Sequence, residues 1–249
     1  MASRAVHVLR VFTRGGLGGN HLGVVTDIAG LDTVAMQSIA AELGFSETVF
    51  VDLTTAEVPF VRIFTPGQEL PFAGHPLVGT AWWLLTSGDS ATERLQCGIG
   101  DVSIGVDGDL AWIEVALEPA NATRDDLTDY ATRAGLADPL RSWRVAMPKD
   151  YIILEYPDAK TVRGADPDAG VMAEHFGTMV VARTDEIAHV RFFAPDAGVF
   201  EDPATGSAAV ALATALAAEG ETEGAMRIHQ GEEMGHPSRI DMIWTARSA

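Results

Sequence analysis

Glu47 is the first residue in this chain of 249 whose type and surroundings suit proton transfer. It lies in the alternating segment Phe45–Val51, where a strand would place it on the same face as Phe45, Val49 and Val51. Desolvation on such a face raises the pKa of a carboxyl group toward the range of a general acid or base. The alternative is a glutamate on an edge strand that reaches solvent, and the residues by themselves leave both interpretations open.

His75 and Asp202 each stand just before an apolar helical segment. His75 lies between Gly74 and Pro76, at the position where an N-cap belongs, and Pro76 fits the first helical position. Histidine is not a preferred N-cap, which favours contact with a ligand over capping. Asp202 also precedes a helix start, where an acidic side chain is favoured by the helix dipole, so capping is its alternative role.

The two helix starts belong to a pair of similar segments. The first reads Arg62-Ile-Phe-Thr-Pro66, then Glu69-Leu-Pro-Phe-Ala-Gly74-His75-Pro76, and the second reads Arg191-Phe-Phe-Ala-Pro195, then Glu201-Asp-Pro-Ala-Thr-Gly206-Ser207. The offset is 191 − 62 = 129 residues at the arginines and 206 − 74 = 132 at the glycines. Each copy reads as a strand, a loop marked by proline and a helix start. We therefore expect two similar halves, residues 1–117 and 118–249, with the site in the cleft between them.

The glycines that lead both helices suit anion binding. Free backbone N–H groups at a helix N-terminus attract a carboxylate or a developing enolate, so Gly74, Gly206 and Ser207 are expected to hold a small anionic substrate. Ser207 with His75 and Asp202 has the composition of a hydrolase triad, but the chain lacks the G-x-S-x-G elbow. A serine at a helix start is more typical of a cap or an anion binder.

The elements that must position these residues are mostly strands. In the first half, strands are expected over residues 6–13, 23–26, 45–53 and 59–64, with helices over 32–43 and from 76 onward. In the second half, strands are expected within 143–155 and over 226–229 and 238–244, with helices over 167–176 and 207–219. The predicted fold class is α+β, with one long apolar helix inside a curved, mostly antiparallel sheet in each half.

Composition excludes several classes of function. The net charge of −18 argues against nucleic acid and anionic membranes as partners. The single cysteine, Cys97, excludes an intramolecular disulfide. No dinucleotide fingerprint, P-loop or metal-ligand spacing is present, so neither a nucleotide site nor a metal site is expected. Residues 1–10 lack the pattern of a secretory signal and the apolar stretch Ala208–Ala218 is shorter than a membrane span, which predicts a cytoplasmic protein.

Several motifs, in order along nearly the whole chain, resemble the PhzF-like phenazine biosynthesis family. They are Phe12-Thr13 with Gly19-Asn20, Ser46-Glu-Thr-Val-Phe50, Phe64-Thr-Pro66 with Glu69-Leu-Pro-Phe-Ala-Gly-His-Pro76, Glu201-Asp-Pro-Ala-Thr-Gly-Ser207 and Gly235-His-Pro-Ser238. The resemblance implies the diaminopimelate epimerase-like fold, a homodimer, and isomerisation of a small carboxylic acid by proton transfer without a cofactor.

The resemblance also implies roles for individual residues. Glu47 matches the general acid/base of the family, and His75 and Asp202 match its partners. The positions implied to hold the substrate are Asn20, Gly74, Gly206 and Ser207. Two residues depart from the family pattern, since His21 replaces a proline and His236 replaces an arginine. The chain is also short for the family.

Two other functions are compatible with the same fold. Epimerases and racemases of this fold use two opposed cysteines, which a chain with Cys97 alone cannot supply. A lyase or an epimerase with other bases, acting on a different substrate, stays open. A protein that binds a small acid without turnover is the remaining alternative, and it would not need Glu47, His75 and Asp202 together.

Overall fold

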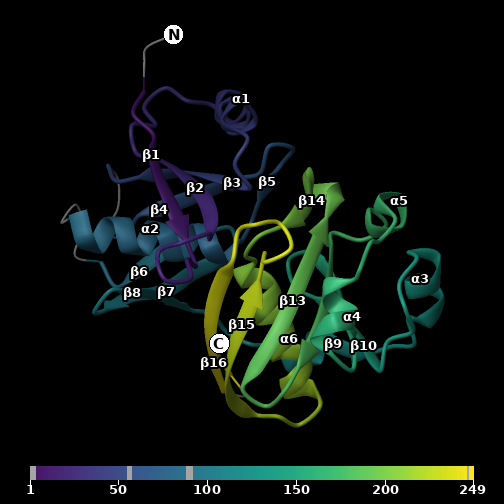
Figure 1. Ribbon diagram of the computed structural model, residues 1–249. Coiled ribbons are helices and arrows are strands. Elements are labelled where there is room, and N and C mark those ends of the chain that lie inside the picture. Colours follow the sequence, from purple (N-terminus) through teal and green to yellow (C-terminus); the bar gives the residue numbers. More distant parts are fainter. Residues whose placement is uncertain (1–3, 55–57, 88–91, 246) are drawn as a thin grey trace. The chain divides into compact units, whose positions relative to one another are not determined.

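The computed structural model describes residues 4–54, 58–87, 92–245 and 247–249 (Figure 1). The chain forms two compact units, each with its own sheet. The first unit contains the residues up to Val11 together with Asn20–Val115, and the second contains Phe12–Gly19 together with Ala116–Ala249. The loop Phe12–Gly19 therefore packs with the second unit, although it joins the first two strands of the first.

The first unit has an eight-stranded sheet and two helices among its described residues. Its strands are β1 (His7–Val11), β2 (Asn20–Val25), β3 (Glu47–Asp52), β4 (Phe60–Phe64), β5 (Glu69–Leu70), β6 (Arg94–Cys97), β7 (Gly100–Asp107) and β8 (Leu110–Glu114). Its helices are α1 (Thr33–Leu43) and α2 (Gly74–Ser87). The strand order is β1-β2-β3-β4-β6-β7-β8, with β5 paired to β4. Because α2 packs against strands from both ends of this order, the sheet curls around it.

The second unit has an eight-stranded sheet of its own. Its strands are β9 (Ala122–Arg124), β10 (Arg141–Ala146), β11 (Asp150–Glu155), β12 (Gly177–Arg183), β13 (Ile187–Ala194), β14 (Val199–Asp202), β15 (Glu223–Gln230) and β16 (Ser238–Thr245). Its helices are α3 (Thr128–Arg133), α4 (Ala159–Arg163), α5 (Ala169–Met172) and α6 (Gly206–Ala218), with 3₁₀ turns η1 (Pro119–Asn121) and η2 (Pro195–Ala197). The order is β16-β15-β13-β12-β11-β10-β9, with β14 paired to β13.

The two sheets repeat the same connections. In the first, β1–β2, β3–β4, β4–β5 and β6–β7 are antiparallel, and β2–β3 and β4–β6 are parallel. In the second, β10–β11, β12–β13, β13–β14 and β15–β16 are antiparallel, and β11–β12 and β13–β15 are parallel. The predicted fold class, two pseudo-symmetric halves with mostly antiparallel sheets, is therefore confirmed.

The sequence of each central helix fits its burial. Helix α6 is rich in alanine, and its buried residues pack into the apolar core of the second unit. In α2, a Cβ on Gly79 would lie 2.5 Å from Leu22 and 2.7 Å from Val11. The absence of a side chain at Gly79 thus lets α2 lie directly on β1 and β2, which brings the start of the helix to the start of β2.

A helix lies within the predicted residues 167–176, but it is shorter than predicted, since α5 spans only Ala169–Met172. Helix α5 and the helix before it, α4, each begin at an aspartate N-cap: Asp158 accepts a hydrogen bond from the Thr161 N–H, and Asp168 accepts one from the Val171 N–H. Helix α4 ends before Gly164 and α5 before Ala173. The capping bond of Asp168 sets the start of α5, and the helix ends four residues before the predicted end at Phe176.

Candidate functional site

Glu47 is the first residue of β3, which lies between β2 and β4 and is not an edge strand. Val49 and Val51 are fully buried, so the carboxylate stands at the end of an apolar face as predicted. Its side chain is 14% exposed, and its Oε2 atom lies 3.3 Å from Nδ1 of His75. The fold therefore joins two residues that are 28 positions apart in the sequence into one acid/base pair.

His75 is the second residue of α2, inside the first helical turn, so its predicted place at the N-cap is wrong. Besides Glu47, its Nδ1 atom lies 3.4 Å from Nδ2 of Asn20, the first residue of β2. Burial lowers the pKa of His75 to about 3, while a hydrogen bond to the backbone of His21 acts in the opposite direction. Burial dominates because the residue is only 3% exposed. The imidazole is therefore neutral at neutral pH.

A neutral imidazole beside a carboxyl group is suited to proton transfer. Each nitrogen of neutral histidine donates in one tautomer and accepts in the other, so Nδ1 can face ionised Glu47 in one tautomer and protonated Glu47 in the other. Asn20 Nδ2 and Glu47 Oε2 lie 3.4 and 3.3 Å from the same ring nitrogen, which in one tautomer accepts from the amide and in the other donates to the carboxylate. The arrangement gives Glu47 a fixed partner while its own side chain stays partly exposed.

Asp202 is buried at the end of β14, and it does not cap α6. The N-cap is Thr205, whose hydroxyl makes no capping bond to the helix. That hydroxyl instead donates to Oδ2 of Asp202 at 2.5 Å. The capping alternative is therefore wrong, and Asp202 is a buried carboxylate held by side chains of its own unit.

Gly74 and Gly206 are the first residues of α2 and α6, as the repeat predicts. Ser207, next to Gly206, is buried and accepts a hydrogen bond at 2.9 Å from the hydroxyl of Tyr151 on β11. Because Tyr151 supplies that hydrogen, the Ser207 hydroxyl can direct its own hydrogen to another acceptor. This suits the start of a helix, where an anion is favoured.

The sequence did not indicate Tyr151, Thr205 or Gln230. Gln230 is the last residue of β15 and donates to the Asp202 backbone carbonyl at 2.7 Å. Thr205 lies in the second repeated segment at the position where the first copy has Ala73. This polar-for-apolar difference is the sequence signal that could have indicated Thr205. Tyr151 and Gln230 lie outside the repeated segments, so no sequence pattern pointed to them.

The predicted substrate positions fall into two groups, one in each unit. Asn20 and Gly74 lie with Glu47 and His75 in the first unit, and Gly206 and Ser207 lie with Asp202 in the second. Cys97 is buried at the end of β6, and burial raises the pKa of its thiol, which disfavours the thiolate that a racemase needs. Across the described part of the chain, no three His, Cys, Asp or Glu side chains are grouped to hold a metal ion.

Within the described residues, every helix is too short or too polar to cross a membrane. Buried His75 lies at the start of α2 and buried Asp202 at the end of β14, shortly before α6, and each helix packs against strands of its own sheet. This is the architecture of the diaminopimelate epimerase-like fold.

The comparison with known proteins gives the family. The chain belongs to the phenazine biosynthesis-like protein family (PhzC-PhzF), whose family model matches residues 9–248. An uncharacterised isomerase of Mesorhizobium japonicum is 35% identical over 99% of this chain and 92% of its own length. The trans-2,3-dihydro-3-hydroxyanthranilate isomerase of Pseudomonas chlororaphis is 31% identical over 93% of this chain and 87% of its own.

A solved structure agrees with the fold. The PhzF-family phenazine biosynthesis protein of Bacillus anthracis superposes with a TM-score of 0.82 at 23% identity, covering 100% of this chain and 94% of that one. The family relatives are isomerases, and this chain is an enzyme of that class.

Proposed function

We propose that this enzyme moves a proton between two carbons of a small carboxylic acid, with Glu47 as the general acid/base and without a cofactor. The observation that carries the proposal is the contact of 3.3 Å between the Glu47 carboxylate and the buried imidazole of His75. A carboxylate that is partly exposed and has a fixed neutral partner suits a group that accepts a proton and returns it.

The proposed reaction is an internal proton shift, in which the substrate neither gains nor loses atoms. Glu47 takes the proton from one carbon, the electron pair of the broken C–H bond moves into the adjoining unsaturated system, and the protonated Glu47 returns the proton to another carbon. The anion formed between these steps needs hydrogen-bond donors, and helix starts such as those of α2 and α6 supply them. His75 orients Glu47 through both protonation states.

Ser207 and Asp202 are proposed to act on the same substrate, an assignment that rests on the family resemblance. Ser207 would donate to the anionic part, because Tyr151 already donates to its oxygen. Asp202 would accept a hydrogen bond or a proton, because the Thr205 hydroxyl donates to its Oδ2. Gly74 and Gly206 leave the helix starts without side chains, and Asn20 holds the His75 ring.

The substrate class proposed is a small unsaturated carboxylic acid. The relative from Pseudomonas chlororaphis is named for trans-2,3-dihydro-3-hydroxyanthranilate, an acid of this kind. His21 and His236, which replace the proline and arginine of the family pattern, are the residues through which the preferred acid would differ. From the same resemblance we propose a homodimer, which light scattering of the purified protein would test.

The test compares wild type with Glu47→Gln. Wild type is incubated with trans-2,3-dihydro-3-hydroxyanthranilate in deuterated water, and isomerisation and deuterium uptake at carbon are followed by NMR. Removing the carboxylate proposed to take the proton from carbon should lower both rates by about 100-fold or more. Glu42→Gln, an exposed glutamate on α1, is the control and should keep the wild-type rates. Full deuterium uptake by Glu47→Gln would refute the assignment of Glu47.

A further inference from the structure

The carboxylate of Asp202 is the end of a buried chain of three polar side chains. Gln230 donates through Nε2 to Oγ1 of Thr205 at 3.0 Å, and Thr205 donates through Oγ1 to Oδ2 of Asp202 at 2.5 Å. Gln230 also contacts both ends of the loop between these residues. Its Nε2 donates to the Asp202 carbonyl at 2.7 Å, and its Oε1 accepts from the Thr205 backbone N–H at 3.2 Å.

These contacts fix the direction of every hydrogen in the chain. If the Gln230 amide were reversed, its NH₂ group would face the Thr205 N–H and its oxygen would face the Asp202 carbonyl, so both contacts would be repulsive. The two Nε2 hydrogens are therefore committed to the Asp202 carbonyl and to Thr205 Oγ1. Because Thr205 Oγ1 accepts from Gln230, its own hydrogen is directed to Asp202. A hydroxyl that donates to a carboxylate favours its ionised form.

The matching positions of the first half can be read from the strand pairing. Phe192 pairs with Asp202 in the second half, and in the first half Ile63, its counterpart one residue after the repeated arginine, pairs with Leu70. Leu70 is therefore the counterpart of Asp202. Counting back one residue from the matched glycines Gly74 and Gly206 makes Ala73 the counterpart of Thr205.

Gln230 has a counterpart by the same method. His189 and Phe60, each two residues before the repeated arginine, pair with His229 and Gln96 in the parallel strands. The next residues along these strands are Gln230 and Cys97. The next residue in each half is a glycine, and both glycines lie against matched prolines of the repeated segments. A Cβ on Gly231 would clash with Pro203, and one on Gly98 would clash with Pro71, which supports the match.

The first half thus builds the same loop from apolar residues. Leu70, Ala73 and Cys97 are 5%, 5% and 4% exposed, and Asp202, Thr205 and Gln230 are 6%, 9% and 2% exposed. The loop and helix start form in both halves, so the fold does not require the polar chain. Burying polar groups has a desolvation cost that an apolar set avoids, which points to a functional reason for the polar set.

We propose that Thr205 and Gln230 are positioning residues that hold Asp202 as an ionised hydrogen-bond acceptor for the reaction. The proposal rests on the proposed function, in that Asp202 takes part in catalysis. Gln230 acts through Thr205 on the carboxylate and directly on the backbone of Asp202. Neither residue needs to touch the substrate.

The test places the residues of the first half into the second. Thr205→Ala and Gln230→Cys reproduce its apolar set, Thr205→Ser keeps the hydroxyl, and Asp202→Asn removes the charge. With trans-2,3-dihydro-3-hydroxyanthranilate as the probe, Thr205→Ala and Gln230→Cys should each lower kcat by about tenfold or more and change KM by less than about threefold. Thr205→Ser should recover most of kcat. In the double variant Thr205→Ala/Gln230→Cys, the fold-loss in kcat should be smaller than the product of the two single fold-losses. Both residues act on one carboxylate, so their effects are not independent.

A second measurement needs no substrate. In protein with ¹³C-labelled aspartate, the carboxyl signal of Asp202 should move in Thr205→Ala and in Gln230→Cys and return toward its wild-type position in Thr205→Ser. Thr205→Ala and Gln230→Cys should also melt below wild type, because the buried Asp202 carboxylate and backbone lose hydrogen-bond donors, so the carboxyl signal and kcat, not the melting temperature, test the positioning role.

The outcomes separate this proposal from the proposed function. If Asp202→Asn keeps full turnover, the catalytic role of Asp202 fails and the positioning role fails with it. If Asp202→Asn is impaired while Thr205→Ala and Gln230→Cys keep kcat and the carboxyl signal of wild type, the positioning role alone is overturned. A change confined to melting temperature would assign the polar chain to stability and would also overturn the proposal.

Discussion

At the scale of single residues, His75 shows how burial decides protonation. Its ring lies 3.3 Å from a carboxylate, which by itself would favour the imidazolium. The ring is nevertheless buried at the start of α2, and desolvation of the charged form lowers the pKa of His75 to about 3. The proposed general acid/base therefore works beside a partner that stays neutral when the pH changes around neutrality.

The lowered pKa of His75 predicts acid sensitivity. An unfolded chain protonates this histidine near its ordinary pKa of 6.5, whereas the folded chain does so only near 3. Between these values the unfolded state binds more protons, so stability falls as the pH falls through this window. Wild type should lose about 2 kcal/mol more than His75→Gln between about pH 6.5 and pH 4.5, in urea unfolding at each pH. Parallel losses in the two proteins would contradict the neutral buried ring.

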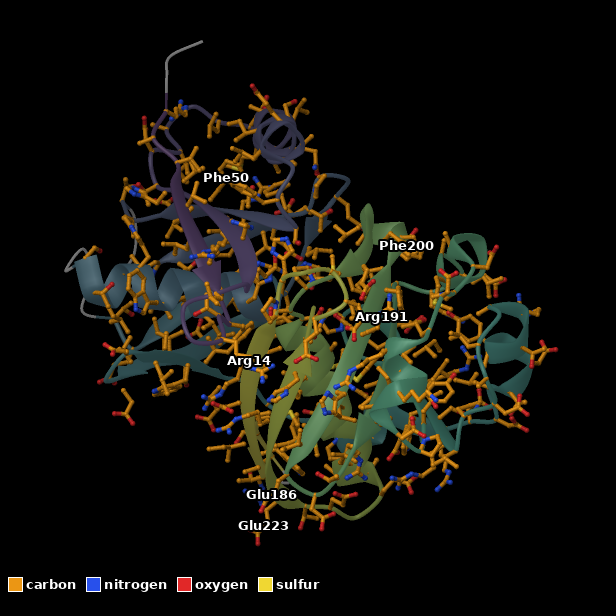
Figure 2. All side chains as sticks on the ribbon, in the orientation of Figure 1. Arg14, Phe50, Glu186, Arg191, Phe200 and Glu223 are labelled. Carbon is orange, nitrogen blue, oxygen red and sulfur yellow. The ribbon has the colours of Figure 1, made fainter. Side chains whose placement is uncertain are left out.

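At the scale of elements, an arginine clamp fixes the strand that leads to each helix start. Arg62 on β4 pairs through Nε and Nη2 with Glu69 on β5, at 2.7 and 2.6 Å. Arg191 on β13, labelled in Figure 2, pairs in the same way with Glu201 on β14, at 2.8 and 2.7 Å. These pairs explain why arginine and glutamate recur in both copies of the repeated segment.

The two clamps differ in burial. The side chains of Arg62 and Glu69 are 25% and 37% exposed, whereas those of Arg191 and Glu201 are 11% and 10% exposed. Arg191 also donates to the backbone carbonyls of Arg163 and Ala165, next to the end of α4. The clamp of the second half therefore holds three segments together and leaves a buried carboxylate behind if the arginine is removed.

Arg191→Gln should destabilise the protein far more than Arg62→Gln. Losing one partner of a buried ion pair costs about 3–5 kcal/mol, because the remaining charge is stranded. A pair as exposed as Arg62 and Glu69 contributes about 1 kcal/mol or less. Thermal unfolding of the two variants under identical conditions measures the difference, and Arg144→Gln, from an exposed pair with Asp125, is a control. Equal melting temperatures for Arg191→Gln and Arg62→Gln would show that burial of the clamp is irrelevant.

At the scale of the whole molecule, two copies of one topology carry different chemistry. The strand pairing that matches Leu70 to Asp202 also matches Leu22 to Tyr151 and Glu47 to Gly177. Each half therefore has polar side chains where the other has apolar ones or none. Duplicated architecture supplies two equivalent helix starts, and substitution at matched positions makes them unlike.

An aspartate placed at Leu70, the counterpart of Asp202, should destabilise the protein, because the first half lacks the polar partners of Asp202. In Leu70→Asp, the new carboxylate would be buried next to positions held by Ala73 and Cys97, which lack the hydroxyl and amide donors of Thr205 and Gln230. We expect a loss of about 3 kcal/mol or more in the free energy of unfolding and no gain in turnover. Leu110→Asp, at an exposed position on β8, should cost less than about 0.5 kcal/mol. A Leu70→Asp protein as stable as this control would show that the buried carboxylate needs no polar partners.

The sequence by itself determined the twofold repeat, the two helix starts at Gly74 and Gly206, and the apolar face that carries Glu47. These features are local, since they depend on residue periodicity, on glycine at a helix start and on the spacing of the repeated arginines. The fold class followed from them together with the family resemblance. That one substrate contacts the groups of both halves stays a prediction.

Only the tertiary structure decided which distant residues meet. Asn20, Glu47 and His75 converge because β2 and β3 are parallel neighbours beneath the start of α2, and no short-range pattern encodes that register. Gln230 reaches Asp202 across 28 residues for the same reason, since β15 pairs in parallel with β13 and ends beside the loop before α6. Strand register places side chains through long-range hydrogen bonding and burial, so these contacts were fixed only when the sheets closed around their helices.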